Sequence, residues 1–440
     1  MTADVQPTPD SDALVDERSR PHRPMPDFAW MTGFECSTFP QIGMDELSLT
    51  QHDRFWGSDI LRARDAGCRT IRYGIRWHVV NPRPHQWDWS SVDGPMELFR
   101  HLEMEPIVDL FHFGAPEWLG TGVMTSIFPD FQAELCREFA RRYPWVRWYT
   151  PTNEPYIMAQ FGGEGGIWYP YQHGPDNFLI AARNVARGLC EGWAAIASER
   201  PDARMLIADT CEYHHSLDAD GPARDLAELR NERRFLMHEL YGGCVGDDHP
   251  LRPYLVEHGM SEEDLFWFQE NPAPLDVVGL DHYPHSEHQY RVGERRQVID
   301  EPRPIEQQLG PAELARQYFA RLGRPLAFAE TGAPGDDARK IWWLDRMVAA
   351  VREARSEGIP VIGMTWWGLL DQVDWGGNLR VFRYEIDRTG LYALRWSAGR
   401  LERVPTAALA AWRRYTAAPL EETVGALAAP AWRGEPAPLW

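Results

Sequence analysis

The sequence predicts an α/β fold, a single (β/α)8 TIM barrel with long loops on its C-terminal face. Short apolar runs that are typical of buried strands alternate with longer stretches of helical periodicity. This alternation occurs eight times, which favours a closed barrel of parallel strands over an open sheet. The chain has 440 residues, 44% of them hydrophobic, whereas such a barrel takes roughly 250 residues before insertions. One large domain therefore accounts for the chain.

The predicted elements follow one another as strand and helix along the chain. The strands are predicted at 28–35, 69–75, 106–112, 146–154, 203–210, 275–283, 325–330 and 359–367. The helices are predicted at 52–67, 92–104, 128–143, 176–198, 224–240, 311–322, 337–358 and 406–415. The barrel domain spans 28–418, between a polar, Pro-rich tail at 1–27, predicted to be disordered, and an irregular tail at 419–440.

Two long loops are predicted after the fourth and sixth strands, at about 156–175 and 281–310. Loops that follow barrel strands lie on the C-terminal face of the barrel, where the active sites of such folds are built. The sequence thus predicts that the active site lies on the C-terminal face of the barrel.

Composition excludes several kinds of partner. The net charge is −20 and no run of basic residues occurs, which argues against nucleic acid and anionic membranes. No apolar stretch reaches the ~20 residues of a membrane span, and the N-terminus lacks the apolar core of a signal peptide. The six cysteines are scattered, as is typical of free thiols in a reducing compartment. A cytoplasmic enzyme is expected, with no prediction of its oligomeric state.

No cofactor and no metal are expected. The only lysine, Lys340, lies at a helix start, which disfavours Schiff-base and pyridoxal-phosphate chemistry. Neither a phosphate-binding P-loop nor a dinucleotide-binding glycine motif is present. His214 and His215, and the histidines of DHYPHSEH at 281–288, lack the usual ligand spacing of a metal site, and His285 and His288 are interpreted as loop residues.

Polar and aromatic side chains recur where the predicted strands end. Each alone has an ordinary explanation, such as a helix cap or a satisfied core residue. Together they would surround one barrel mouth, and this shared position favours a functional site. The set is Glu35, Arg72, His112, Asn153, Glu154, His282, Tyr283, Glu330 and Trp366.

Glu154 and Glu330, at the ends of the fourth and seventh strands, are the candidate catalytic pair. Two carboxylates across a barrel mouth can cleave a glycosidic bond, one protonating the leaving oxygen and the other attacking the anomeric carbon. Their roles need different pKa values. We expect Arg72 to keep Glu330 ionised by lowering its pKa, and Glu154 to lie in a less polar place that keeps it protonated.

The high tryptophan content is the second feature that favours a sugar-binding site. The chain has 20 Trp, several of them after the eighth strand and in the loop after the fourth. Flat aromatic faces suit stacking against the apolar faces of sugar rings.

With these residues on view, the sequence resembles the family-1 glycoside hydrolases, the β-glucosidase and β-galactosidase group of retaining (β/α)8 enzymes. The likeness runs from about Phe28 to Tyr415. Six motifs carry it: RTIRYGIRWHVVNP at 69–82, VDLFHFGAPEWL at 108–119, NEP at 153–155, GLDHYP at 279–284, FAETGAP at 328–334 and TWWGLLDQVDW at 365–375. Single motifs are modestly specific, but their order on successive strands is strong.

The resemblance implies a retaining β-glycosidase that works by double displacement through a covalent glycosyl-enzyme. It implies Glu154 as acid/base and Glu330 as nucleophile, with Asn153 holding the sugar 2-hydroxyl. Its other implied substrate-binding residues are Glu35, Arg72, His112, Tyr283, Trp366, Asp374 and Trp375. The substrate would be a small-molecule or oligosaccharide glycoside.

Three departures bear on which sugar is bound. Asp374 stands where the family has Glu, Thr331 replaces Asn after the nucleophile, and the first-strand Gln is matched only by Glu35 or, out of register, Gln41. Three other functions stay open from the sequence: a transglycosidase on the same site, a non-catalytic sugar-binding barrel and a metal-dependent barrel isomerase.

Overall fold

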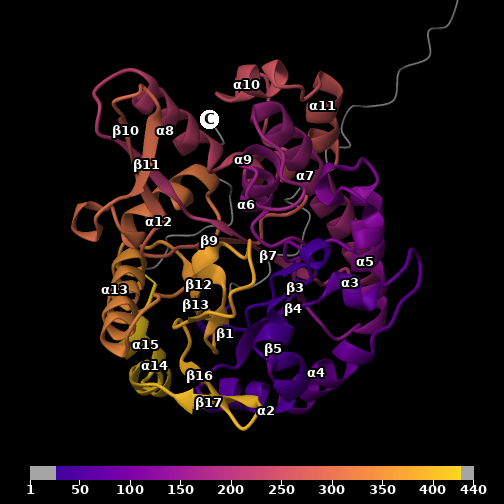
Figure 1. Cartoon of the computed structure of the whole chain (residues 1–440), viewed down its shortest axis with the longest axis vertical. Coiled ribbons are helices and arrows are strands. Elements are labelled where there is room, and N and C mark those ends of the chain that lie inside the picture. Colours follow the sequence, from indigo (N-terminus) through magenta and orange to yellow (C-terminus); the bar gives the residue numbers. More distant parts are fainter. Residues whose placement is uncertain (1–25, 428–440) are drawn as a thin grey trace, which may run out of the picture.

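The computed structural model describes residues 26–427, and its centre is a closed barrel of parallel strands in the order β1-β13-β12-β9-β7-β6-β5-β4 (Figure 1). The predicted barrel is confirmed, since each predicted strand overlaps one barrel strand. The strands are β1 (Ala29–Gly33), β4 (Thr70–Gly74), β5 (Glu105–Asp109), β6 (Trp148–Thr150), β7 (Arg204–Thr210), β9 (Val277–Asp281), β12 (Leu326–Thr331) and β13 (Val361–Trp366).

Side chains that alternate along these strands divide between two apolar layers. One layer joins the outer faces of the strands to the helices, and the other is a small cluster inside the barrel. The inner cluster consists of Met31, Ile107, Leu206, Ala208, Val277, Ala327, Ala329 and Ile362. These apolar groups fill the barrel interior, and the polar side chains of the strand ends lie at its mouth.

Helices surround the barrel, and their starts and ends lie close to the prediction. They include α2 (His52–Asp65), α4 (Ser90–His101), α5 (Phe128–Arg142), α7 (Pro175–Glu199), α12 (Pro311–Leu322), α13 (Asp337–Ser356) and α14 (Ala407–Ala417). The predicted helix 224–240 is instead two helices, α8 (Pro222–Arg233) and α9 (Leu236–Tyr241). The break falls at Arg234, whose guanidinium is anchored to Glu212 O and Gln317 Oε1. No helix within residues 26–427 has the length and apolar character needed to cross a membrane.

The two long predicted loops contain regular structure. The first holds α6 (Pro155–Ala159) and one π-helical turn (Gln160–Glu164). The second holds β10 (Glu287–Val292) and β11 (Val298–Pro302), which form a three-stranded sheet with β8 (Tyr213–Ser216) in the order β11-β10-β8. This added sheet lies beside α8 at the upper left of Figure 1.

The predicted irregular tail at 419–440 is wrong at its start. Residues Leu420–Val424 form the short helix α15, which packs against α13. Val424 is fully buried, and the side chains of Arg352 and Arg355 donate to the backbone oxygens of Thr423 and Gly425. Residues 428–440, like residues 1–25 of the predicted N-terminal tail, lie outside the described part of the chain.

Candidate active site

Arg72 is the centre of the polar network at the barrel mouth. It lies on β4 between two outward-facing apolar residues, so its side chain points into the barrel, where it is fully buried. Its Nη1 donates to Glu330 Oε1 at 2.6 Å, and its Nη2 donates to Asp109 Oδ2 and Asn153 Oδ1, both at 2.6 Å. A buried cation of this kind is retained only with such partners. The predicted pocket position of Arg72 therefore agrees with the geometry.

Glu330 lies at the end of β12, where the strand's register shifts against both neighbouring strands. Such irregularities re-aim side chains at the rims of barrels. The second carboxylate oxygen, Oε2, accepts a hydrogen bond from Tyr283 Oη at 2.8 Å. Burial raises the pKa of Glu330, and it outweighs Arg72 and His112, which act in the opposite direction, so the net lowering expected from Arg72 is not found. Both oxygens of Glu330 are thus held by donors that favour its ionised form.

Glu154 occupies a very different environment. It follows β6 in a left-handed conformation, with φ 40° and ψ 60°, and Pro155 starts α6 directly after it. Its amide donates to Ala208 O at 2.8 Å, which secures this sparsely populated backbone geometry. Within residues 26–427 its carboxylate has no hydrogen-bond donor. Burial, then the negative charges of Glu330 and Asp209, raise the pKa of Glu154 well above its ordinary value.

Three buried aspartates, none of them predicted as site residues, surround this pair. Asp281 ends β9 with both carboxylate oxygens lacking a hydrogen-bond partner, and burial followed by Glu330 raises its pKa well above the usual range. Burial also raises the pKa of Asp209 well above the usual range. Burial alone would raise the pKa of Asp109, but Arg72 and His112 outweigh it, and that pKa is lowered. The sequence could have indicated these aspartates by their positions at or near strand ends. Asp281 also lies inside the motif GLDHYP.

His112 lies between Asn153 and Glu35 at the mouth, with its Nε2 3.9 Å from Glu35 Oε1. Asn153 Nδ2 lies 3.3 Å from His112 Nε2, and the His112 ring stacks at 7° on the ring of Trp367. Glu35 accepts from Trp367 Nε1 at 2.8 Å and from Gln372 Nε2 at 3.1 Å. Of the two candidates on the first strand, Glu35 thus enters the site. Gln41 lies elsewhere and donates to Ala115 O.

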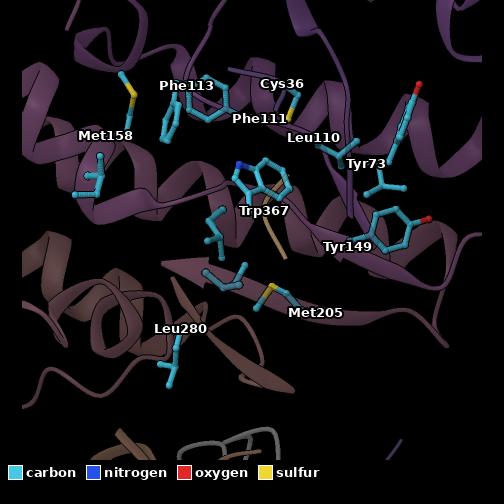
Figure 2. Close-up of a cluster of buried hydrophobic side chains, with 14 of the residues drawn as sticks. Cys36, Tyr73, Leu110, Phe111, Phe113, Tyr149, Met158, Met205, Leu280 and Trp367 are labelled. Carbon is cyan, nitrogen blue, oxygen red and sulfur yellow. The ribbon is translucent and has the colours of Figure 1, made fainter. Parts of the chain in front are cut away.

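Trp366, predicted as a substrate-binding residue, does not face the polar network. Trp366 is fully buried and donates from Nε1 to Thr389 O at 3.0 Å, away from the network. Trp367 instead lies under the Arg72 guanidinium, 4.9 Å from ring to cation, which is a cation–π contact. Figure 2 shows the Trp367 ring amid buried side chains such as Phe111 and Phe113. Counting back eight residues from Trp375 in the motif would have selected Trp367.

Asp374 is not free to bind a ligand. Its carboxylate accepts three backbone amides, those of Arg383, Tyr384 and Glu385, at 2.9–3.0 Å. The prediction that Asp374 grips a sugar is therefore replaced by a role in holding the loop 375–385. Trp375 beside it is partly buried, and its ring packs edge-on against Trp168 at 6.2 Å, with Nε1 lacking a partner.

Cys36, Asp109 and His112 place potential metal-binding atoms within 4.8 Å of one another. Asp109 Oδ2 is already bonded to the Arg72 cation, which would repel a metal ion. Burial raises the pKa of the Cys36 thiol well above its ordinary value, so the thiol stays protonated. We therefore assign no metal to this mouth. Lys340 lies outside it, its Nζ donating to Gly390 O at 2.9 Å.

Known proteins that resemble this chain include named glycosidases. The lactase-like protein of Mus musculus is 22% identical over 393 residues, covering 78% of this chain and 66% of that protein. The bifunctional β-D-glucosidase/β-D-fucosidase of Bifidobacterium breve is 24% identical over 380 residues, covering 73% and 79%. The β-galactosidase of Sulfolobus acidocaldarius is 23% identical over 333 residues, covering 66% and 64%.

Solved structures share the fold at still lower identity. A family 1 β-glucosidase from Thermotoga maritima in complex with isofagomine lactam superposes with a TM-score of 0.74 at 16% identity, covering 89% of this chain and 97% of that one. The β-glucosidase of the same organism in complex with deoxynojirimycin gives 0.75 at 17%, with the same coverage. No protein-family model matches the chain. The chain thus resembles β-glucosidases and β-galactosidases in sequence at 21–24% identity, and it shares the barrel fold of a family 1 β-glucosidase.

Proposed function

We propose that the chain is a retaining β-glycosidase in which Glu330 is the nucleophile and Glu154 the acid/base. The observation that carries this proposal is the contrast between the two carboxyl groups. Glu330 is held by Arg72 and Tyr283, whereas Glu154 has no donor and a pKa raised well above its ordinary value. Two carboxyl groups whose environments separate their pKa values match the acid and nucleophile of this reaction.

In the first step, Glu330 attacks the anomeric carbon while Glu154 gives its proton to the leaving oxygen. The products are a glycosyl ester on Glu330, the free alcohol and an ionised Glu154. In the second step, water attacks the anomeric carbon while the Glu154 carboxylate takes a proton from it. The bond to Glu330 breaks, which releases the sugar and restores Glu330 as a carboxylate and Glu154 as an acid. Tyr283, whose pKa is raised well above 10 by burial and by Glu330, stays protonated and keeps the nucleophile in position.

The remaining polar groups support a sugar at this point of the mouth. Asn153 and His112 lie beside Arg72, so a sugar on Glu330 would meet their nitrogen atoms first. The relatives' names include glucosidase, fucosidase and galactosidase, so we propose a β-linked glycoside as the substrate. With Asp374 occupied by backbone amides, this chain lacks the acidic grip that the resemblance implied at that position.

The experiment is to trap the intermediate with a panel of 2-deoxy-2-fluoro-β-glycosides and to digest the protein with trypsin. We expect one added fluorosugar on the peptide 322–339, which contains Glu330. Label on another peptide would contradict the nucleophile assignment. Active protein that no member of the panel labels would contradict the covalent route.

Two substitutions test the roles separately. Glu330→Gln should reduce hydrolysis of aryl β-glycosides to background. Glu154→Gln should lower it by about 10²–10⁴-fold for poor leaving groups, the usual contribution of a general acid, and by less for activated ones. The exposed Glu263→Gln is the matched control and should keep full activity. Normal turnover by Glu330→Gln would overturn the proposal in favour of another site.

We also propose a cytoplasmic location. Its support is that all six cysteines are free thiols, five of them buried, as suits a reducing compartment. Fractionation of the producing cells, with detection by antibody, tests this location.

A further inference from the structure

A second cluster of ionisable groups lies at the start of the added sheet of β8, β10 and β11. His214 on β8 and His288 on β10 are direct partners in the parallel register of these strands, so their side chains share one face. Glu212 precedes β8 by one residue and follows the end of β7. The carboxylate of Glu212 and one ring nitrogen of each histidine lie within 4.8 Å of one another.

The outer nitrogen of each ring is already held. His214 Nδ1 is bonded to Tyr290 Oη at 2.8 Å, and His288 Nδ1 to Asp300 Oδ1 at 2.9 Å. This leaves both Nε2 atoms facing Glu212. Metal-binding histidines are oriented in the same way, by a hydrogen bond from the ring nitrogen that does not bind the ion.

The inner nitrogens do not complete an ordinary hydrogen-bond network. His214 is 3% exposed, and among residues 26–427 its Nε2 has no hydrogen-bond partner, although Glu212 Oε2 is 3.4 Å away. His288 Nε2 lies 3.9 Å from Glu212 Oε1, too far for a hydrogen bond. A buried polar atom without a partner requires an explanation.

These separations suit an ion placed between the groups. Zinc binds imidazole nitrogen and carboxylate oxygen at about 2.0–2.2 Å in tetrahedral geometry, which sets neighbouring ligand atoms roughly 3.3–3.6 Å apart. The observed 3.4 and 3.9 Å need only a small adjustment of the half-buried His288. Arg230, the cation that acts on this cluster, is paired with Glu164 at 3.3 Å.

We propose that Glu212, His214 and His288 bind one Zn²⁺ ion. Two imidazoles and one carboxylate are a ligand set that zinc accepts, with a fourth position left for water or a ligand hydroxyl. The ion would join the end of β7 to β8 and β10, and β10 begins shortly after Tyr283. None of these three residues belongs to the proposed catalytic pair, although the charge of Glu212 acts on the pKa of Glu154. The proposal departs from the interpretation of His288 as a loop residue.

The test uses untagged full-length protein treated with chelator and then desalted. After dialysis against micromolar ZnCl₂, we expect elemental analysis to find about one Zn per chain and thermal unfolding to shift to a higher temperature. With Co²⁺ in place of Zn²⁺, we expect the visible absorption bands of a tetrahedral site. Both readouts are independent of hydrolytic activity, so they do not depend on the proposed function.

Glu212→Gln and His288→Gln should lose the bound metal and the Zn-dependent shift while their metal-free unfolding temperature stays near that of the wild type. His288 is the safer variant, because its side chain is 23% exposed. The matched control is His258→Gln, since His258 pairs only with the exposed Asp176, at 2.7 Å, and should keep the site. Absence of Zn from the wild type, or Zn binding by both site variants at the wild-type level, would overturn the proposal.

Discussion

At the scale of single residues, the pKa of each carboxyl group in the site depends on whether it has a cationic or hydrogen-bonding partner. Arg72 reaches Asp109 and Glu330 directly and leaves Glu154 and Asp281 without a donor. The pKa of Asp109 is therefore lowered, whereas the pKa values of Glu154 and Asp281 are raised well above their ordinary values. An apparent pKa measured here belongs to the cluster, because the groups interact strongly.

This arrangement predicts a bell-shaped dependence of kcat/KM on pH. Activity should fall as pH drops below the pKa of Glu330, because the nucleophile becomes protonated. It should also fall as pH rises above the pKa of Glu154, because the acid loses its proton. Since both pKa values are raised, the bell should lie above the ordinary carboxyl pKa of 4.5, with slopes of about tenfold per pH unit.

The check is a pH profile of Glu154→Gln measured with an activated aryl glycoside. Its alkaline limb should disappear, while the acid limb remains because Glu330 is unchanged. The exposed Glu263→Gln should keep both limbs. An alkaline limb that persists in Glu154→Gln would assign it to another group.

The predicted residues that the structure brings to the mouth are those whose strand positions decide the direction of their side chains. Arg72 and Glu330 point into the mouth because of their place on β4 and β12. Trp366 and Trp367 are adjacent aromatics at a strand end, where a shift of one residue exchanges the two faces. Asp374 was misjudged for another reason, since its amide partners lie 9–11 residues further along an irregular segment that no local pattern predicts.

At the scale of elements, Asp374 makes the segment 375–385 dependent on one side chain. A carboxylate that accepts several backbone amides acts as a local cross-link, and each hydrogen bond to a charged group contributes about 1.5–3 kcal/mol. The segment carries exposed Arg383 and Tyr384, so loss of that carboxylate should favour local opening.

Asp374→Ala should therefore be cleaved by trypsin after Arg380 or Arg383 at least about tenfold faster than the wild type, since 1.4 kcal/mol corresponds to a factor of ten. Limited proteolysis with mass spectrometry of the fragments measures this rate. Glu385→Ala is the control, because it removes an exposed carboxylate and keeps the backbone amide. Equal rates for the two variants would show that the segment is held by other contacts.

At the scale of the whole molecule, the barrel was predictable because one pattern is repeated eight times and each unit supports the others. The added sheet was not predictable, since β8 and β10 pair across more than seventy residues and neither strand has an apolar alternation strong enough to identify it. The helix α15 was missed because five residues are too few to give a periodic signal. Long-range contacts decide both elements.

The packing of α15 against α13 gives a prediction for the stability of the whole barrel. Ending the chain after Pro419 removes α15, so Arg352 and Arg355 lose their acceptors on Thr423 and Gly425. It also uncovers the apolar site filled by Val424. We expect the free energy of unfolding to fall by about 2–4 kcal/mol, because hydrogen bonds from charged groups contribute about 1.5–3 kcal/mol each and water replaces part of them.

The matched comparison is a chain ended after Leu427, which keeps α15 and all three of these contacts. Thermal unfolding of the two truncated proteins at one heating rate gives the difference, and the shorter chain should unfold at the lower temperature. Because Arg355 also donates to Val361 O at the start of β13, its release should weaken that barrel strand. Equal unfolding temperatures would show that α15 covers the barrel without stabilising it.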